Sequence, residues 1–139
     1  MATTRTAACE WHGSLMEGSG RVALESSGVG TFDVTWASRT EQPEGRTSPE
    51  ELIAAAHASC FSMALSSGLA KAGHPPTTLN TRAEVDFQPG EGITGIRLQV
   101  SGDVPGLDAD GFREAAEAAK VGCPVSNALA AVPITLTVD

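Results

Sequence analysis

The sequence has little positive charge. Its 139 residues include nine lysines and arginines against seventeen aspartates and glutamates, which gives a formal net charge of -8. A protein with this balance repels phosphate groups, so the composition argues against a nucleic-acid-binding protein and against docking on anionic membranes. It does not indicate a substrate.

The sequence also lacks targeting and disulfide signals. Its first residues are polar and contain no apolar core of the kind found in signal peptides. The longest apolar stretches are expected to fall short of a membrane span, so a cytoplasmic location is expected. Cys9, Cys60 and Cys123 are an odd number at wide spacings, unlike a secreted disulfide framework. In a reducing compartment, cysteines that meet in space are more often catalytic or metal-binding than structural.

The length predicts one domain over 1–139. Apolar alternation predicts a small antiparallel meander followed by a polar loop over 37–47 and, later, two long strands joined by a hairpin. A helix, a short helix and a closing strand follow. The expected strands are 4–12, 21–26, 31–36, 77–88, 93–104 and 134–138, and the expected later helices are 108–121 and a short one from Pro124. Strands interrupted by helices, with few βαβ units, indicate an α+β fold.

The best-marked element is a helix expected over 48–72. Ser48 suits the N-cap, Pro49 suits the first helical position, and Glu51 lies where a capping box needs a carboxylate. The segment is apolar almost all round, which predicts a central, buried helix.

Two cysteines stand in contexts that suggest chemistry. Cys60 lies in the middle of the long helix, where it is either an inert core thiol or a reactive one that needs a nearby cation or base. Cys123 lies between Gly122 and Pro124, at the expected N-cap of the short helix, where free backbone N–H groups favour a thiolate. From the residues alone Cys123 is the more easily activated thiol, and Cys9 has no such context.

His57 lies three residues before Cys60, on nearly the same side of the helix. It could be a base, a metal ligand or a satisfied core histidine. With Cys60 and Cys123 it would supply three ligands, so a zinc-binding protein is an alternative. A Cys–His acyl-transfer enzyme would also need an oriented base and an oxyanion hole, and the sequence marks neither.

A peroxide-reactive thiolate needs an arginine, because guanidinium lowers the thiol pKa and can bind peroxide oxygens. Arg21, Arg39 and Arg46 are candidates. A carboxylate would hold the guanidinium in a bidentate pair, and Glu50 is free for this because Glu51 is needed at the cap. Ten residues of helix separate Glu50 from Cys60, about 15 Å. A bridging side chain, or a second subunit with its helix antiparallel, would have to bring the two groups together.

Two segments resemble the OsmC/Ohr family of thiol-dependent hydroperoxide reductases. They are Ser48-Pro-Glu-Glu-Leu-Ile-Ala-Ala-Ala-His-Ala-Ser-Cys-Phe-Ser-Met-Ala-Leu and Lys120-Val-Gly-Cys-Pro-Val-Ser, and each contains one of the two cysteines singled out above. The His57-Ala-Ser-Cys60 form and the position of Arg39 are more similar to the osmotically inducible OsmC branch than to the Ohr branch. The resemblance covers nearly the whole chain.

The resemblance implies a cytoplasmic peroxidase with an intertwined homodimeric α+β fold, in which antiparallel sheets pack around a long central helix and the active sites lie at the interface. Cys60 would attack an organic hydroperoxide, or hydrogen peroxide less efficiently, and become a sulfenic acid that Cys123 resolves to a disulfide. Arg39 and Glu50 would activate the thiolate and orient the peroxide. The family uses no bound cofactor; an external dithiol, of lipoyl type in relatives, would reduce the disulfide. The family gives the nucleophile's role to the first cysteine, and we adopt that assignment.

Overall fold

The computed structural model describes all 139 residues. The chain forms two compact units, residues 1–52 and residues 53–139, and each is described by itself. That the two units make one domain stays a prediction.

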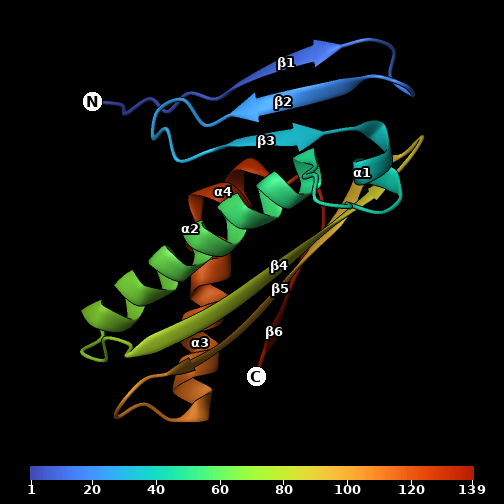
Figure 1. The fold of residues 1–139 in the computed structure, drawn as a ribbon. Helices are drawn as coiled ribbons and strands as arrows, with labels where there is room; N and C mark the ends of the chain where they lie inside the picture. Colours follow the sequence, from blue (N-terminus) through green and yellow to red (C-terminus); the bar gives the residue numbers. More distant parts are fainter. The chain divides into compact units, whose positions relative to one another are not determined.

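The first unit contains a three-stranded antiparallel sheet in the order β1-β2-β3 (Figure 1). Its strands are shorter than the sequence predicted: β1 is Ala8–His12, β2 is Ser19–Ala23 and β3 is Thr31–Val34. Gly20 lies on the apolar face, paired with Trp11 on one side and Val34 on the other. A Cβ at Gly20 would lie 2.7 Å from the Trp11 ring and 2.9 Å from the Val34 side chain, so the close packing there requires glycine.

A short helix, α1 (Trp36–Thr40), stands where the sequence predicted a polar loop. A reciprocal cap starts it: the Ser38 N–H donates to Thr35 Oγ1 and the Thr35 N–H donates to Ser38 Oγ, both at 3.0 Å. The pattern is a capping box in which serine replaces the usual Glu or Gln, which is why the polar run did not stand out as a helix.

Helix α2 (Pro49–Lys71) confirms the predicted long helix. Ser48 caps it, because Ser48 Oγ accepts a hydrogen bond from the Glu51 N–H at 3.1 Å. The Glu51 carboxylate accepts a hydrogen bond from the Thr47 hydroxyl at 2.6 Å, so it satisfies the residue before the cap instead of the Ser48 N–H. The predicted partner of the Glu51 carboxylate, the Ser48 N–H, is therefore wrong; its partner is the hydroxyl of Thr47, one residue earlier.

Burial of α2 is confined to one stripe, although its composition predicted burial all round. His57, Phe61, Leu65 and Leu69 follow one another at four-residue spacing and are at most 1% exposed. On the opposite side Met63 is 72% exposed. The helix therefore has an apolar face that this single chain leaves uncovered.

By length and hydropathy, α2 could span a membrane: its 23 residues contain an 18-residue window of mean hydropathy 1.4. The expectation that no apolar stretch reaches that length was wrong. The buried stripe of α2 belongs to a protein core, and a core helix is apolar for that reason.

The second unit contains a sheet in the order β4-β5-β6, formed by β4 (Thr78–Gln88), β5 (Gly92–Asp103) and β6 (Ile134–Val138). The β4–β5 hairpin is the one predicted. However, β6 pairs with β5 in parallel, whereas an antiparallel sheet was expected. A parallel neighbour needs a crossover connection, and α3 (Ala109–Gly122) with α4 (Pro124–Ala128) provides it.

The core of the second unit lies between helices and one face of this sheet. Leu98 and Val100 of β5 point to the same face because they are two residues apart. Against them pack the buried stripe of α2 and the apolar face of α3, which includes Phe112 and Ala116. Figure 1 shows α2 running beside β4, and the Ser62 hydroxyl of α2 donates to Thr81 Oγ1 of β4 at 2.7 Å. This core holds both α2 and the α3–α4 junction in place.

Candidate active site

Two thiols meet in the second unit. Cys60 comes from α2, and Cys123 lies between the end of α3 and the start of α4. Both are free thiols, and their side chains lie close enough for each to shift the pKa of the other. Cys123 is completely buried, whereas Cys60 is partly exposed. The structure therefore brings together the two cysteines that the sequence singled out and leaves solvent access to one of them.

The pKa values of the two thiols shift in opposite directions. Burial raises the pKa of Cys60, and the hydrogen bond to Cys123 raises it further. Burial also tends to raise the pKa of Cys123, but the backbone N–H of Ser126 and the hydrogen bond from Cys60 outweigh it, with smaller contributions from the Ser126 side chain and the Val125 N–H, so the pKa of Cys123 is lowered. Of the two sulfurs, Cys123 is therefore the one on which a negative charge is favoured, with Cys60 S–H as the donor. This agrees with the sequence-based inference that Cys123 is the more easily activated thiol.

The helix that follows Cys123 affects the thiol through its first N–H groups rather than through the dipole of a long helix. Helix α4 has only five residues, and Pro124 takes its first position as predicted. The Cys123 side chain makes no cap hydrogen bond of good geometry. The N–H groups of Val125 and Ser126 therefore act on the sulfur as nearby dipoles, and their effect fades within about one turn.

His57 is fully buried beside this pair. Its Nε2 lies 2.7 Å from Ser126 Oγ, and its Nδ1 has no hydrogen-bond partner. Burial lowers the pKa of His57, so the imidazole is neutral at pH 7. No role for Ser126 was predicted from the sequence. Its position three residues after Cys123 was the available signal, because it is the third position of a helix that Cys123 caps.

The structure contains no set of ligands for the zinc site considered as an alternative. No group of three or more His, Cys, Asp or Glu side chains is placed to hold a metal ion. The Nε2 of His57, which would have to coordinate the metal, is within hydrogen-bond distance of Ser126.

An arginine–carboxylate pair lies in the first unit. Arg39 Nε donates to Glu50 Oε1 at 3.0 Å, and Arg39 Nη2 donates to Glu50 Oε2 at 2.9 Å. Such a fork is stronger and more directional than a single contact. The Glu50 side chain is only 8% exposed, and the Arg39 guanidinium also lies 5.8 Å from the centre of the Trp36 ring. The guanidinium is thus held on two sides by a carboxylate and an aromatic ring.

The pair joins the last turn of α1 to the first turn of α2. Arg39 comes from α1, which the sequence missed, and Glu50 comes from the first turn of α2. The Ser38 hydroxyl of α1 donates to the Thr47 carbonyl just before α2, at 2.8 Å. This contact fixes the loop between the two helices, so the pair does not depend on side-chain lengths alone.

The remaining candidates lie elsewhere. Arg21 on β2 pairs with Asp33 on β3 at 3.6 Å, with more than half of each side chain exposed. Arg46 and Cys9 are exposed. None of the three is part of the thiol pair or of the Arg39–Glu50 pair.

Comparison with known proteins agrees with this geometry. Residues 42–138 match the family model described as OsmC-like protein. The chain belongs to the OsmC-like family. It is 44% identical over 124 residues to the peroxiredoxin OsmC of Escherichia coli, which covers 87% of this chain and 86% of the relative. With this similarity the chain is a thiol peroxidase, and enzymes of this type need no prosthetic group.

Solved structures show the same OsmC-like fold. An organic hydroperoxide resistance protein OsmC from Legionella pneumophila superposes with a TM-score of 0.76 at 25% identity, covering 99% of each chain. The organic hydroperoxide resistance protein OhrB of Bacillus subtilis gives a TM-score of 0.71 at 25% identity, covering 96% of this chain and 98% of that one. An OsmC-like protein of Vibrio cholerae has a TM-score of 0.77 at 15% identity and shows the fold alone.

Proposed function

We propose that this peroxidase reduces organic hydroperoxides through Cys60 and Cys123. The Cys60 thiolate attacks the terminal peroxide oxygen, the O–O bond breaks, and the alcohol leaves with a proton. Cys60 becomes a sulfenic acid. The Cys123 sulfur then attacks Cys60, the hydroxide leaves and is protonated to water, and a Cys60–Cys123 disulfide forms. The observation that carries this proposal is the meeting of two free thiols, Cys60 from α2 and Cys123 from the α3–α4 junction, close enough to shift each other's pKa.

Access decides which thiol meets the peroxide. The lowered pKa favours a resting charge on Cys123, but Cys123 is completely buried and Cys60 is not. A peroxide can therefore reach only Cys60. Transfer of one proton along the Cys60–Cys123 hydrogen bond gives the Cys60 thiolate that the reaction needs.

Arg39 and Glu50 are proposed to favour that thiolate and to orient the peroxide. A guanidinium held by a buried carboxylate keeps a fixed direction, and it presents charge without the entropy loss of ordering a mobile side chain. Glu50 acts here as the group that positions Arg39.

The surroundings of Cys60 support an organic hydroperoxide as the substrate. Cys60 packs against the apolar core cluster of the second unit, so an alkyl or acyl substituent on the peroxide would find apolar contacts that hydrogen peroxide lacks. Two structural relatives at 25% identity are named as organic hydroperoxide resistance proteins. The disulfide would be reduced by an external dithiol through thiol–disulfide exchange, in the cytoplasm.

A coupled assay tests this function. We expect turnover with an organic hydroperoxide such as cumene hydroperoxide and dihydrolipoamide as the reductant, with a kcat/KM about tenfold or more above that for hydrogen peroxide, since burying a few methylene groups contributes that much. Thioredoxin in place of dihydrolipoamide identifies the reductant class. Absence of turnover with every hydroperoxide under both reductants would overturn the proposal.

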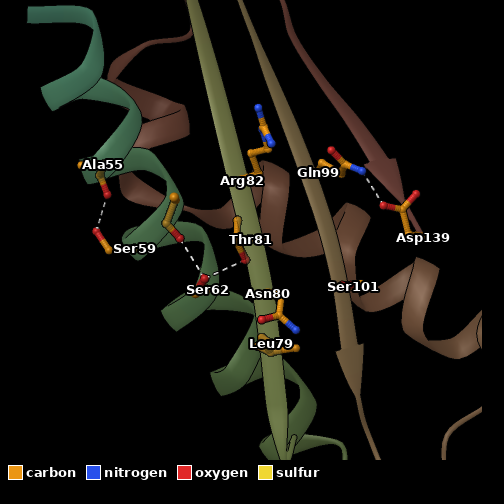
Figure 2. Close-up of a pocket in the computed structure, with 11 residues that line it drawn as sticks. Ala55, Ser59, Ser62, Leu79, Asn80, Thr81, Arg82, Gln99, Ser101 and Asp139 are labelled. Carbon is orange, nitrogen blue, oxygen red and sulfur yellow. Dashed lines mark hydrogen bonds between the residues drawn. The ribbon is translucent and has the colours of Figure 1, made fainter. Parts of the chain in front are cut away.

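We also propose that the protein acts as a homodimer. Ala56, Ser59, Met63, Ser67 and Ala70 form an exposed stripe of small or apolar residues along α2, opposite its buried stripe. Beside this stripe lies a groove of about 660 Å³ between α2 and the sheet. Figure 2 shows Ala55, Ser59 and Ser62 of α2 on one side of it and Leu79 to Arg82 of β4 on the other. A second copy would cover this face. Across a two-fold axis the same surface meets itself, and a stripe without charged side chains can do so without repulsion between like charges.

The dimer is tested by one substitution. Met63 is exposed and lies in the middle of the stripe. Met63→Asp would bury a charge in a dimer interface but would leave it in water in a monomer, so we expect the sedimenting mass to fall from that of a dimer to that of a monomer. Sedimentation analysis of the parent chain and of an exposed control, Val121→Asp on α3, decides this. A parent chain that is monomeric and active would contradict the dimer.

A further inference from the structure

The buried histidine beside the thiol pair has no part in the mechanism given so far. His57 is 0% exposed, Ser126 is 5% exposed, and the two side chains are 2.7 Å apart. A buried polar pair of this kind costs free energy to desolvate, and an apolar pair would fill the same space. The pair reaches the thiols through Ser126, which lies three residues after Cys123 in α4.

The direction of the His57–Ser126 hydrogen bond can be inferred from Nδ1, the second ring nitrogen of His57. Nδ1 is buried and without a partner. An unpaired buried N–H is rarer in proteins than an unpaired acceptor, so Nδ1 carries no proton and the neutral ring holds its proton on Nε2. His57 Nε2–H therefore donates to Ser126 Oγ. The hydroxyl hydrogen of Ser126 is then free to point to another acceptor.

Cys123 is the acceptor that the helix geometry supplies. Cys123 is the N-cap of α4 and Ser126 is the third residue of that helix. A side chain at this third position can turn back towards the cap residue, and since the Cys123 N–H already donates to the Ala119 carbonyl at 2.9 Å, the group left there for the Ser126 hydroxyl is the Cys123 sulfur. The Ser126 side chain interacts with the Cys123 sulfur and lowers its pKa.

We propose that His57 and Ser126 form a donor chain, His57 Nε2–H to Ser126 Oγ–H to Cys123 Sγ, that stabilises the thiolate of the resolving cysteine when it attacks the oxidised Cys60. The inference rests on the proposed role of Cys123 as resolving thiol. Ser126 contacts the reacting sulfur, and His57 is a positioning residue that acts through Ser126. The chain serves the second chemical step, in which Cys123 must be a nucleophile even though it is buried.

Other ionisable groups around Cys123 are few. Helix α4 contains none, and α2 contributes Cys60 and His57. Lys120 near the end of α3 has its ammonium 3.4 Å from the Ile134 carbonyl and 3.9 Å from Glu117. The charged residues of β4 and β5, among them Arg82, Glu84 and Arg97, alternate with core residues and point to the opposite face of the sheet. Besides burial and the backbone N–H groups of Ser126 and Val125, the ionisation of Cys123 therefore depends on Cys60 and on the Ser126–His57 chain.

The test is a titration of Cys123 that does not need peroxidase activity. In a Cys9→Ser/Cys60→Ser background Cys123 is the single thiol, and its thiolate absorbance in the ultraviolet gives its pKa. Ser126→Ala should raise this pKa by about one to two pH units, the effect of losing one hydrogen bond to a charged group. His57→Leu should raise it in the same direction, and His57→Gln, whose amide can still donate to Ser126, should return it towards that of the parent.

A second measurement separates the inference from the proposed function. In the chain with all three cysteines, Cys60 is first oxidised rapidly with excess cumene hydroperoxide, and the rate of disulfide formation is then measured as a function of pH. In Ser126→Ala and His57→Leu we expect the midpoint of this pH dependence to move to higher pH. At high pH the rate should return to that of the parent. Thermal melting reports the structural cost of each substitution independently. A lowered melting temperature with an unmoved Cys123 pKa and unmoved midpoint would overturn the donor chain. A parent chain that forms no disulfide would overturn the proposed function, while the titration would still decide the donor chain.

Discussion

Replacing Cys60 with serine is expected to abolish hydroperoxide consumption, with a loss on the order of 10³-fold or more. Serine has nearly the same size, but its hydroxyl does not ionise near neutral pH, so no nucleophile remains at the thiol that solvent can reach. The initial rate of consumption of an organic hydroperoxide in the presence of excess dithiol measures the effect. Cys9→Ser is the matched control, because Cys9 is exposed on β1 and separate from the thiol pair, and we expect it to retain the parent rate.

Cys123→Ser should have a different consequence. The first step would still occur once, so one equivalent of hydroperoxide would be consumed and turnover would then stop with Cys60 oxidised. If Cys123→Ser consumed no peroxide while Cys60→Ser consumed one equivalent, the roles of the two cysteines would be reversed. That outcome would agree with the lowered pKa of Cys123 and would require a path for peroxide to a sulfur that is completely buried in this structure.

Replacing Arg39 with lysine is the second change from which we expect a large effect, a fall in kcat/KM of about 10²-fold. Lysine keeps the charge but cannot make the two-pronged contact in which Arg39 Nε and Nη2 bind the two oxygens of Glu50. The charge would therefore lose its fixed direction. Pre-steady-state oxidation of Cys60 measures the effect on the first step alone. Glu50→Gln should act in the same direction, because it leaves the guanidinium without its counter-charge.

Arg46→Lys is the matched control for this prediction. Arg46 lies in the loop that follows α1, but it is exposed and precedes the cap of α2. We expect it to retain the parent rate. Equal losses in Arg39→Lys and Arg46→Lys would indicate a general effect of replacing an arginine in this part of the chain, and an unchanged rate in Arg39→Lys would remove Arg39 from the mechanism. A melting curve for each variant distinguishes these outcomes from unfolding, since a nearly buried carboxylate loses its partner in Arg39→Lys.

The long helix could be predicted from sequence because its start depends on local chemistry. Ser48 and Pro49 mark it, and no residue inside it interrupts the backbone hydrogen bonds. The parallel placement of β6 could not be predicted in this way. The alternating residues of 134–138 predict a strand, but which strand it pairs with, and in which direction, depends on how α3 and α4 pack across the sheet. Burial of α2 was also overestimated, because an apolar composition does not say whether one chain or two cover the helix.

In the candidate site, too, local features could be predicted from the sequence and contacts between distant residues could not. The local context of Cys123, between glycine and proline, identified a thiol that backbone N–H groups could activate, and its lowered pKa agrees. The partner of Glu50 was narrowed to a few arginines but rested on a helix, α1, that the sequence did not reveal. Ser126 was missed because its contact is with His57, 69 residues earlier in the chain, and a serine on its own gives no pattern. Contacts between distant residues of this kind depend on the packed core.

The central claim is that Cys60 receives the peroxide oxygen and Cys123 resolves it. The most direct measurement is peptide mass spectrometry after one equivalent of cumene hydroperoxide, with a sulfenic-acid trap present, on the parent chain and on Cys123→Ser. We predict a Cys60–Cys123 disulfide in the parent, and trapped sulfenic acid on Cys60 in Cys123→Ser. Oxygen found on Cys123 in the parent, with Cys60 remaining a free thiol, would contradict the claim.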